Sequence, residues 1–447
     1  KYNLNYFYIF NFKFFSINII NKRLNKMGGG LIQIVAYGAQ DIYLTGNPQI
    51  TFFKVVYKRH TNFAIESIEQ TFNGSVNFGN TVTCELSRNG DLVNKVYLQV
   101  ELPELKQTSN NGSASTYVHW VNGVGNAMIK RLDLLIGGQL IDSHYAEWLD
   151  IWGELNVDKS QKLAYQEMVG YFESTTGLKK NANGKTSRYY VPLQFFFNRN
   201  AGLALPLIAL QYHEVVFKLQ LNDLDNLVNS DVAFTSAETD SSVTASVTSC
   251  SLWVDYIYLD TDERRRFAQI SHEYLIEQVQ HLGSENIAIN STSKKVDINY
   301  NHPVKSIHWV IQDSLYLASN TSTGNNVLKY VCNTTDITDT FDTAKLVLNN
   351  SDRFKERNAD YFRLVQNYQH SKVAPTKTIY SYSFGLRPYE HQPSGSCNFS
   401  RLDSSHLFFT FNATNHTPTT AKTIKVYAVN YNVLRIMSGM GGIAFSN

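Results

Sequence analysis

The stretch that decides the fold is Ser251–Gln280, which reads SLWVDYIYLDTDERRRFAQISHEYLIEQVQ. Its first part alternates as a β-strand does, with Leu252, Val254 and Tyr256 on one face. Charged residues then replace the apolar ones, and a polar connector leads into a new apolar run at 274–279. One strand ends here and another begins, so we predict a junction between two β domains of roughly 200 residues each.

The rest of the chain supports two β domains. A chain of 447 residues is too long for one ordinary core. The composition, 43% hydrophobic and 17% charged, is typical of a globular protein, and 27 Tyr and 26 Phe favour strands over helices. Asn-Gly turn signals recur at 73–74, 89–90, 111–112 and 122–123. This spacing predicts antiparallel sandwiches rather than a β-α-β succession.

Charge and cysteine content exclude several classes of protein. The formal net charge of +2 gives no large basic field, so we expect no specific nucleic-acid binding. The cysteines are isolated from one another and form no C-x-x-C pair, which argues against a disulfide framework or a zinc site and favours a reducing compartment. They are Cys84, Cys250, Cys332 and Cys397. No uninterrupted apolar stretch reaches the 18 or so residues of a spanning helix.

The N-terminal region differs from the rest. Residues 1–26 consist almost wholly of Asn, Lys, Ile, Phe and Tyr, and we interpret them as a non-native upstream extension, with Met27 as the start. Residues 27–49 then form an arm before a first strand predicted at Ile50–Tyr57. Basic residues follow around Lys58 and Arg59, either as a solvated strand end or as a phosphate or lipid contact.

Two helices are predicted within the β pattern. Tyr145, Trp148, Leu149 and Trp152 lie at i, i+3, i+4 and i+7, which indicates a helix capped by Asp142 or Ser143. We expect this aromatic face to cover the end of a sandwich rather than to stack on a ligand. A second helix is expected within Ser351–Tyr368, and a last long strand at Ile424–Ile436, which parallels the strand at Leu252–Leu259.

A search for catalytic motifs finds none that is complete. Gly184-Lys185-Thr186 resembles the end of a phosphate loop, but Lys179 stands where the leading glycine belongs. His272-Glu273 begins a zinc-protease pattern, but Ile276 replaces the second histidine. No G-x-S-x-G or H-x-H is present. We therefore assign no catalytic, cofactor-binding or metal residues and predict that the protein is not an enzyme.

Asparagine sequons are the recurring feature of the second half, where long polar insertions predict exposed loops. Either these loops carry glycans on an outer face, or Asn-, Ser- and Thr-rich loops produce sequons by chance. The candidate glycosylation sites are Asn290, Asn320, Asn333, Asn349, Asn398 and Asn412.

Several long strings resemble, in order, the major capsid proteins of nucleocytoplasmic large DNA viruses, especially those of chloroviruses and other phycodnaviruses, with iridoviruses as more distant relatives. They span nearly everything from Met27 onward and leave residues 1–26 outside. The strings lie at Gly28–Ser67, Leu132–Asp142, Phe195–Val215, Leu259–Gln278, Gln392–Arg401 and Asn430–Gly442.

The resemblance implies an all-β tandem double jelly roll, two eight-stranded antiparallel sandwiches with short helices in loops. We place the first jelly roll at 50–262, a connector at 263–275 and the second jelly roll at 276–447. The family forms homotrimers that act as pseudo-hexagonal capsomers and contact neighbouring capsomers and minor capsid proteins. The expected location is the virion capsid, assembled in the host cytoplasm, with the arm near an internal viral membrane.

Two alternatives stay open at this point. One is a carbohydrate-binding or glycan-cleaving jelly roll, and the other is a minor capsid or spike protein of the same fold. The charged cluster at the junction also has two interpretations, since it is either solvated or sets the angle of the two jelly rolls through interdomain salt bridges. Its members are Asp262, Glu263, Arg264, Arg265 and Arg266.

Overall fold

A computed structural model describes residues 29–103, 105, 109–110, 113–114, 118–171, 187–230, 245–316, 326–330, 339–411 and 420–446. The chain divides into two compact units, Lys1–His60 and Thr61–Asn447. In the described part of the first unit, helices α2 (Gly29–Val35) and α3 (Ile42–Thr45) are followed by an exposed extended segment.

The strand predicted at Ile50–Tyr57 is wrong, because these residues lie in this extended segment and have no strand partner. The first strand of the sandwich, β1 (Phe63–Thr71), begins later, where Phe63 pairs with Leu259 of β13 (Ser249–Leu259). A β-rich composition does not make a strand without a neighbouring edge to pair with.

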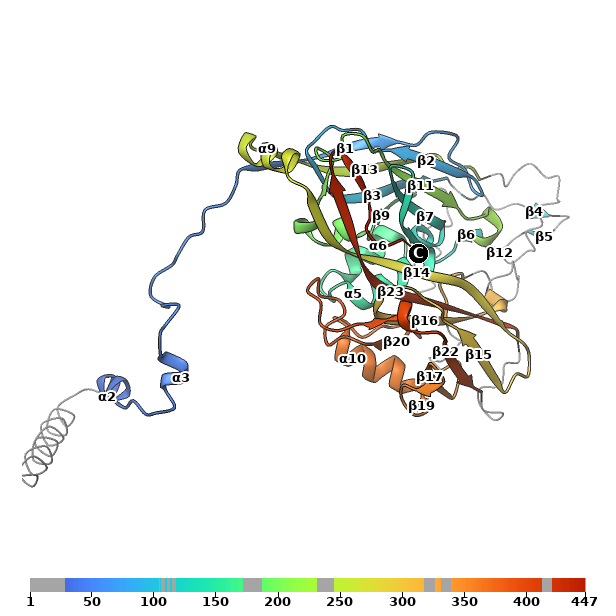
Figure 1. The fold of residues 1–447 in the computed structure, drawn as a ribbon. Helices are drawn as coiled ribbons and strands as arrows, with labels where there is room; N and C mark the ends of the chain where they lie inside the picture. Colours follow the sequence, from blue (N-terminus) through green and yellow to red (C-terminus); the bar gives the residue numbers. More distant parts are fainter. Residues whose placement is uncertain are drawn as a thin grey trace, which may run out of the picture. The chain divides into compact units, whose positions relative to one another are not determined.

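The first sandwich of the second unit consists of two antiparallel sheets (Figure 1). In one sheet the order is β1-β13-β3-β10, with β9 also paired to β3. In the other the order is β2-β11-β7-β8. The further strands are β2 (Thr81–Glu85), β3 (Leu92–Leu102), β7 (Ile129–Ile136), β8 (Gln139–His144), β9 (Ser187–Pro192), β10 (Leu205–Pro206) and β11 (Val215–Leu221).

The second sandwich repeats this arrangement with sheets β14-β23-β16-β20 and β15-β22-β17-β18. Strands β21, β24 and β19 extend these sheets by pairing with β16, β23 and β17. Their bounds are β14 (His272–Ile287), β15 (Ser293–Asp297), β16 (Pro303–Asp313), β17 (Thr343–Leu348), β18 (Ser351–Asp352), β19 (Arg357–Asn358), β20 (Tyr380–Ser383), β21 (Cys397–Asn398), β22 (Ser405–Thr410), β23 (Lys422–Met437) and β24 (Met440–Ile443).

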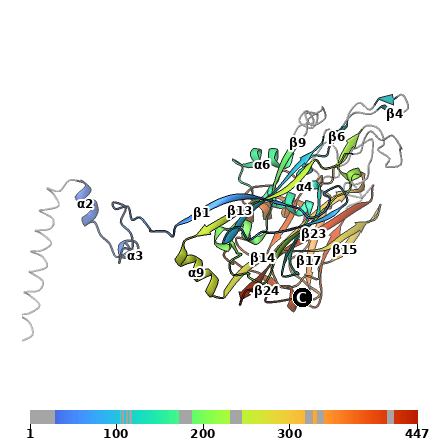
Figure 2. The same ribbon diagram turned by 90° about the horizontal axis from the view of Figure 1, so that it is seen from above.

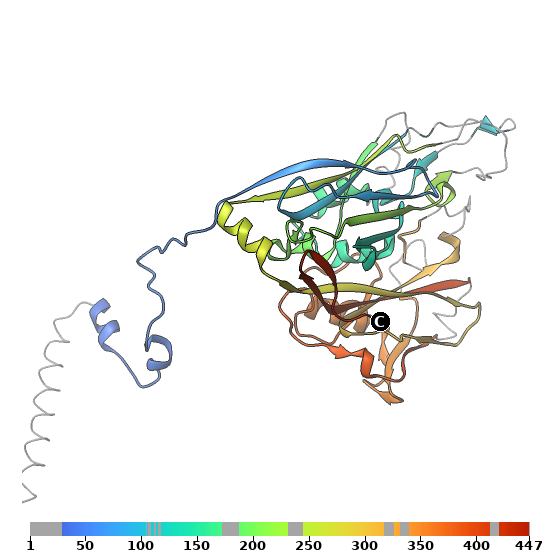
Figure 3. The ribbon, with the colours of Figure 1, turned by 45° about the horizontal axis from the view of Figure 1, so that its top comes forward.

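The two sandwiches have the same strand order, in which the first strand, β1 or β14, pairs with the long strand β13 or β23. That strand also pairs with the third strand, β3 or β16. This is the order of a jelly roll, so the predicted tandem double jelly roll is confirmed. Figure 3 shows the two jelly rolls side by side, the first in blue to green and the second mostly in orange to red. The strands predicted at 252–259 and 424–436 are also confirmed, and β13 and β23 occupy equivalent positions.

Short helices and bridging strands fill the loops between the main strands. The helices are α4 (Val124–Ala127), α6 (Lys162–Val169), α8 (Phe196–Arg199), α10 (Gln366–His370), η1 (Ala201–Leu203), η2 (Leu224–Asn226), η3 (Ser314–Tyr316), η4 (Tyr361–Val365) and η5 (Phe399–Arg401). The small strands are β4 (Ser109–Asn110), β5 (Ser113–Ala114), β6 (Val118–Trp120) and β12 (Val228–Ser230). Among the described helices, none combines the length and apolarity that crossing a bilayer requires.

The predicted helix around Trp148 is confirmed as α5 (Ala146–Asn156), but its predicted caps are wrong. Asp142 and Ser143 belong to β8, because the pairing of β8 with β7 continues to His144, and Tyr145 takes the N-cap position. The second predicted helix begins only at 359, since residues 351–352 and 357–358 pair as β18 and β19.

The charged segment between the jelly rolls forms a helix, where the sequence predicted only a polar connector. Helix α9 (Thr261–Gln269) follows β13 directly and leads to β14 (Figure 2). Asp260 caps it through a carboxylate that accepts from the Thr261 N–H at 2.7 Å. Acidic residues fill the first turn and Arg266 the last, an order that matches the helix dipole. Asp260 and the acidic first turn are helix-start signals that the sequence already contains.

Candidate functional site

The two jelly rolls meet along α5, which belongs to the first jelly roll and packs on β14, β16 and β23 of the second. Its residues Trp148, Ile151 and Leu155 share one buried cluster with residues of these strands. The ring centroids of Trp148 and Tyr427 lie 6.0 Å apart. We expected this aromatic face to cover the end of one sandwich. Instead it forms the apolar centre of the contact between two sandwiches, which we call the α5 interface.

Buried carboxylates on α5 surround this apolar centre. Asp150 accepts from the Lys377 ammonium at 2.6 and 2.7 Å, and Glu147 pairs with Lys425 of β23. Glu154 accepts from the Thr376 hydroxyl at 2.8 Å. Every one of these partners lies in the second jelly roll. The three carboxylates therefore fix the position of α5 against that roll.

Opposite charges at the α5 interface partly offset the cost of burial, although burial still raises the pKa of Asp150. Burial by itself lowers the pKa of Lys377, but Asp150 and Glu154 outweigh it, so the pKa of this ammonium is raised. Burial likewise raises the pKa of Glu147, but Lys425 reverses the effect and lowers that pKa. A buried pair of this kind favours one geometry, because removing either partner leaves an uncompensated charge.

A second set of contacts links α8 and β8 of the first jelly roll with β14 and β16 of the second. Glu277 of β14 accepts from the Arg199 guanidinium at 2.9 Å and pairs with the Lys305 ammonium at 2.5 Å. Asp142 accepts from the Val279 N–H at 2.9 Å, which connects β8 to β14. Arg199 and Asp142 come from the first jelly roll, and their partners come from the second.

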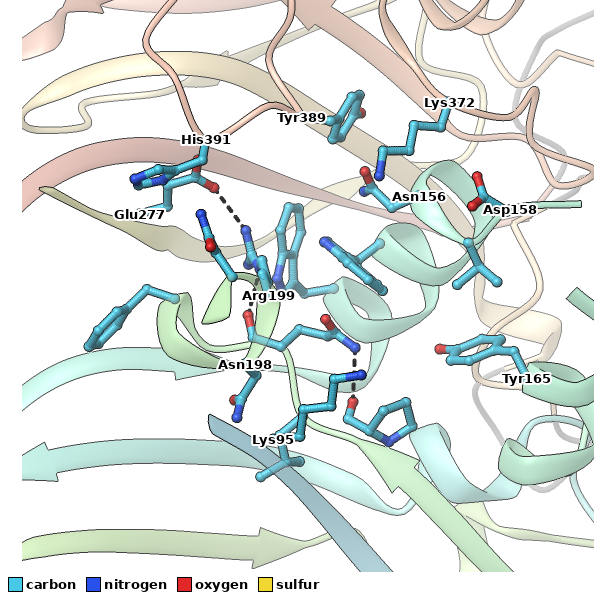
Figure 4. Close-up of a pocket in the computed structure, with 18 of the residues that line it drawn as sticks. Lys95, Asn156, Asp158, Tyr165, Asn198, Arg199, Glu277, Lys372, Tyr389 and His391 are labelled. Carbon is cyan, nitrogen blue, oxygen red and sulfur yellow. Dashed lines mark hydrogen bonds and ion pairs between the residues drawn. The ribbon is translucent and has the colours of Figure 1, made fainter. Parts of the chain in front are cut away.

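A cleft of about 760 Å³ opens between the jelly rolls beside these contacts (Figure 4). The first jelly roll contributes Lys95, Asn156 and Arg199 to its lining, and the second contributes Glu277 and Lys372. Figure 4 shows these labelled side chains arranged around the opening. Among the described residues, no three His, Cys, Asp or Glu side chains gather in a way that could hold a metal ion.

The predicted charged cluster lies on α9. Arg264 contacts Asp91 at 3.0 Å, and Arg266 contacts Glu263 at 3.6 Å. Asp91 also accepts from the Leu259 N–H at 2.9 Å, so it holds the start of α9 to the first jelly roll. The Arg264–Asp91 pair joins the connector to the first jelly roll, whereas the Arg266–Glu263 pair lies within α9. An interdomain role of the cluster stays a prediction.

Sequence reasoning missed the residues that bridge the two jelly rolls. The signal was available in α5, whose sequence AEWLDIWGELN places Glu147, Asp150 and Glu154 among large apolar residues. A helix with a single buried face would keep its carboxylates in solvent. Here nearly the whole helix is buried, so the carboxylates need partners on another element.

Three of the six candidate glycosylation sites lie among the described residues. Asn290, Asn349 and Asn398 are exposed, and the side-chain Oδ1 of Asn349 accepts from the backbone N–H groups of residues 403 and 404. Their glycosylation stays a prediction. The other candidates, Asn320, Asn333 and Asn412, lie outside the described residues, as do Cys332 and the Gly184-Lys185-Thr186 turn.

Comparison with known proteins identifies the class. Residues 51–260 match the family model described as major capsid protein N-terminus, and residues 263–442 match the one described as large eukaryotic DNA virus major capsid protein. The major capsid protein of Pyramimonas orientalis virus is 47% identical, with 94% of this chain and all of that protein covered. That of Paramecium bursaria Chlorella virus 1 is 41% identical with the same coverage. The chain therefore belongs to the major capsid proteins of large eukaryotic DNA viruses.

Solved structures agree with this assignment. The chain in the quasi-atomic model of the PBCV-1 virus capsid is 36% identical and matches with a TM-score of 0.73, covering 89% of this chain and all of that one. The Faustovirus major capsid protein shares the fold with a TM-score of 0.69 at 13% identity, over 94% of this chain and 98% of that one. The predicted resemblance is confirmed, and these matches support a capsid protein over a glycan-binding or glycan-cleaving jelly roll.

Proposed function

We propose that the protein trimerises into a pseudo-hexagonal capsomer of an icosahedral shell and works by assembly rather than catalysis. The observation that carries this proposal is the repeated jelly-roll order within one compact unit. Three chains with two similar jelly rolls each present six similar units, which can fill a site on a hexagonal lattice. The trimer contact would be heterologous and ring-closing, so that each copy presents two different surfaces.

The α5 interface supports this proposal, because six-fold packing requires a fixed angle between the two jelly rolls. Buried aromatic rings and paired carboxylates hold α5 to the second jelly roll. A flexible linker between the two rolls would not define such an angle.

The decisive measurement is the mass of the purified full chain in solution. Sedimentation velocity at micromolar concentration should give a trimer, and electron microscopy of the same sample should show uniform pseudo-hexagonal particles. A protein that sediments only as a monomer contradicts the proposal.

We propose further that the N-terminal arm contacts minor capsid proteins or an internal viral membrane. The described part of the arm exposes large apolar side chains, among them Tyr43 at 88% and Leu44 at 86%. Lys54, Lys58 and Arg59 follow the arm directly and are suited to anionic headgroups. We propose in addition that the capsomer contacts neighbouring capsomers and that the shell assembles in the host cytoplasm. The domain limits 27–49, 50–262, 263–275 and 276–447 are part of this proposal.

A further inference from the structure

The cleft between the jelly rolls carries an excess of positive charge. Among the described residues that line it are four cationic side chains and two carboxylates. The cations are Lys95, Arg199, Lys305 and Lys372, and the carboxylates are Asp158 and Glu277. Glu277 lies between Arg199 and Lys305 and contacts both. One carboxylate therefore compensates two cations at the wall of the cleft.

The most buried of these cations is Lys305, whose side chain is 3% exposed. Its ammonium has three N–H donors, of which Glu277 accepts one, while the ring of Tyr431 lies 5.5 Å away. Burial lowers the pKa of Lys305 to about 8, which indicates that its charge is incompletely compensated by Glu277. A further anion beside it would restore the ordinary preference for the charged form.

The two buried neutral groups of this lining that have no hydrogen-bond partner among the described residues are also donors. Trp148 and Asn156 line the cleft and are 2% and 8% exposed. Within the described part of the chain, neither the Trp148 indole N–H nor the Asn156 amide nitrogen has a hydrogen-bond partner. Buried donors of this kind normally find an acceptor. Donors and cations together define a site for a ligand that only accepts hydrogen bonds.

We infer that this cleft binds a small multivalent oxyanion, a phosphate or a polycarboxylate, held by Arg199 and Lys305 with Trp148 and Asn156 as neutral donors. Arg199 retains one nitrogen, Nη2, for which the described residues supply no acceptor, since Nε donates to the Gln194 carbonyl and Nη1 to Glu277. Lys372 and Lys95 are exposed and add charge at the opening. The bound anion would contact both jelly rolls and stabilise their relative position.

The inference does not depend on trimer formation, so it can be tested on the full chain in whatever assembly it adopts. Isothermal titration with inorganic phosphate and, separately, with citrate in a chloride buffer of constant ionic strength measures binding and distinguishes the two chemistries. Saturable binding of one or both is expected. Absence of saturable binding of both anions overturns the inference.

Variants then assign the binding to the cleft. Lys305→Met keeps the volume and removes a buried cation, and it should weaken binding about tenfold or more, which corresponds to one charged hydrogen bond. Lys355→Gln removes an exposed lysine that does not line the cleft and should leave the affinity within about twofold. Equal affinities in both variants would show loose surface attraction and overturn the assignment.

A second pair of variants decides the question if Lys305→Met does not fold. Lys372→Gln changes only an exposed lining residue, and Trp148→Phe removes the indole N–H while keeping an aromatic ring in the apolar cluster. Each should weaken binding several-fold while the sedimentation profile stays unchanged. Wild-type affinity in both variants contradicts the inference.

Discussion

At the scale of single residues, His308 of β16 is a buried histidine at the contact between the jelly rolls, and its pKa links the stability of the fold to pH. Its ring nitrogens lie 2.9 Å from the Ser381 hydroxyl and 3.0 Å from the Ser306 hydroxyl, and the ring lies 5.8 Å from that of Trp148 on α5. Burial, and secondarily the charge of Lys305, lowers the pKa of His308 from 6.5 to about 3. The folded chain therefore keeps this imidazole neutral where the unfolded chain would protonate it.

This shift predicts loss of stability in mild acid. Between pH 6.5 and about 3 the unfolded chain binds a proton that the folded chain does not, so lowering the pH favours unfolding. The slope for one such group approaches about 1.4 kcal/mol per pH unit. His308→Asn should make the fall in unfolding free energy from pH 6 to pH 5 shallower by about that amount, as measured by urea titration.

The control for this prediction is His370→Asn, since the hydrogen bond of His370 to the Leu386 carbonyl is exposed. It should leave the acid slope of the wild type in place. If His308→Asn retains the full slope as well, the acid sensitivity arises from other groups.

At the scale of elements, α5 is held by a buried ion pair whose loss should be costly. Lys377→Met leaves the Asp150 carboxylate buried without its cation, and we expect a loss of about 3 kcal/mol in unfolding free energy. Adding Asp150→Asn should recover part of this loss, because the unpaired charge is removed. Urea unfolding of the two single variants and the double variant measures the coupling.

An exposed ion pair provides the comparison. Lys345→Met breaks the contact with Asp352 at 3.3 Å, where the Asp352 side chain is 49% exposed, and should cost less than about 1 kcal/mol. If Lys377→Met and Lys345→Met lower the unfolding free energy equally, the buried ion pair of the α5 interface is no more important for stability than an exposed one.

The connector helix α9 allows a prediction about the charged cluster. Arg264 contacts Asp91, whereas no ion pair of Arg265 occurs among the described residues. Replacing Arg265 is therefore a control for replacing Arg264. Arg264→Ser should lower the unfolding free energy by up to about 1 kcal/mol, because the arginine side chain is 63% exposed. Arg265→Ser should change it little.

Thermal melting and sedimentation of these two variants separate the possible roles. A loss of trimer in Arg265→Ser would support the interdomain role that we predicted for the whole cluster. Unchanged trimers in both variants, and in the variant with Arg264, Arg265 and Arg266 all replaced by serine, would leave these residues as solvated charge.

At the scale of the whole molecule, the division into two units predicts separable functions. The residues of the arm, 28–48, lie within the unit Lys1–His60, and both jelly rolls lie within Thr61–Asn447. Deleting residues 28–48 should leave the melting temperature and the trimer unchanged but impair shell assembly. The measurement is the yield of closed particles in cells, compared with the full chain. Normal particles from the deletion variant would contradict the proposed role of the arm.

The sequence alone determined the class of the protein and most of its β architecture. Alternation at Leu252, Val254 and Tyr256 and the apolar run of 424–436 predicted two equivalent strands, since local periodicity records which face of a strand is buried. The long strings shared with a family of capsid proteins then supplied the connectivity that periodicity does not contain. The helix at Trp148 was predictable for the same local reason.

Tertiary structure decided what local patterns do not encode. The run at 50–57 has the composition of a strand, yet it pairs with no strand among the described residues. Likewise α5 shows an apolar face in its sequence, but its carboxylates at 147, 150 and 154 acquire their role only from Lys425, Lys377 and Thr376 of the other jelly roll. The carboxylates of α5 depend on partners more than 200 positions away in the sequence, and only the folded chain brings those partners together.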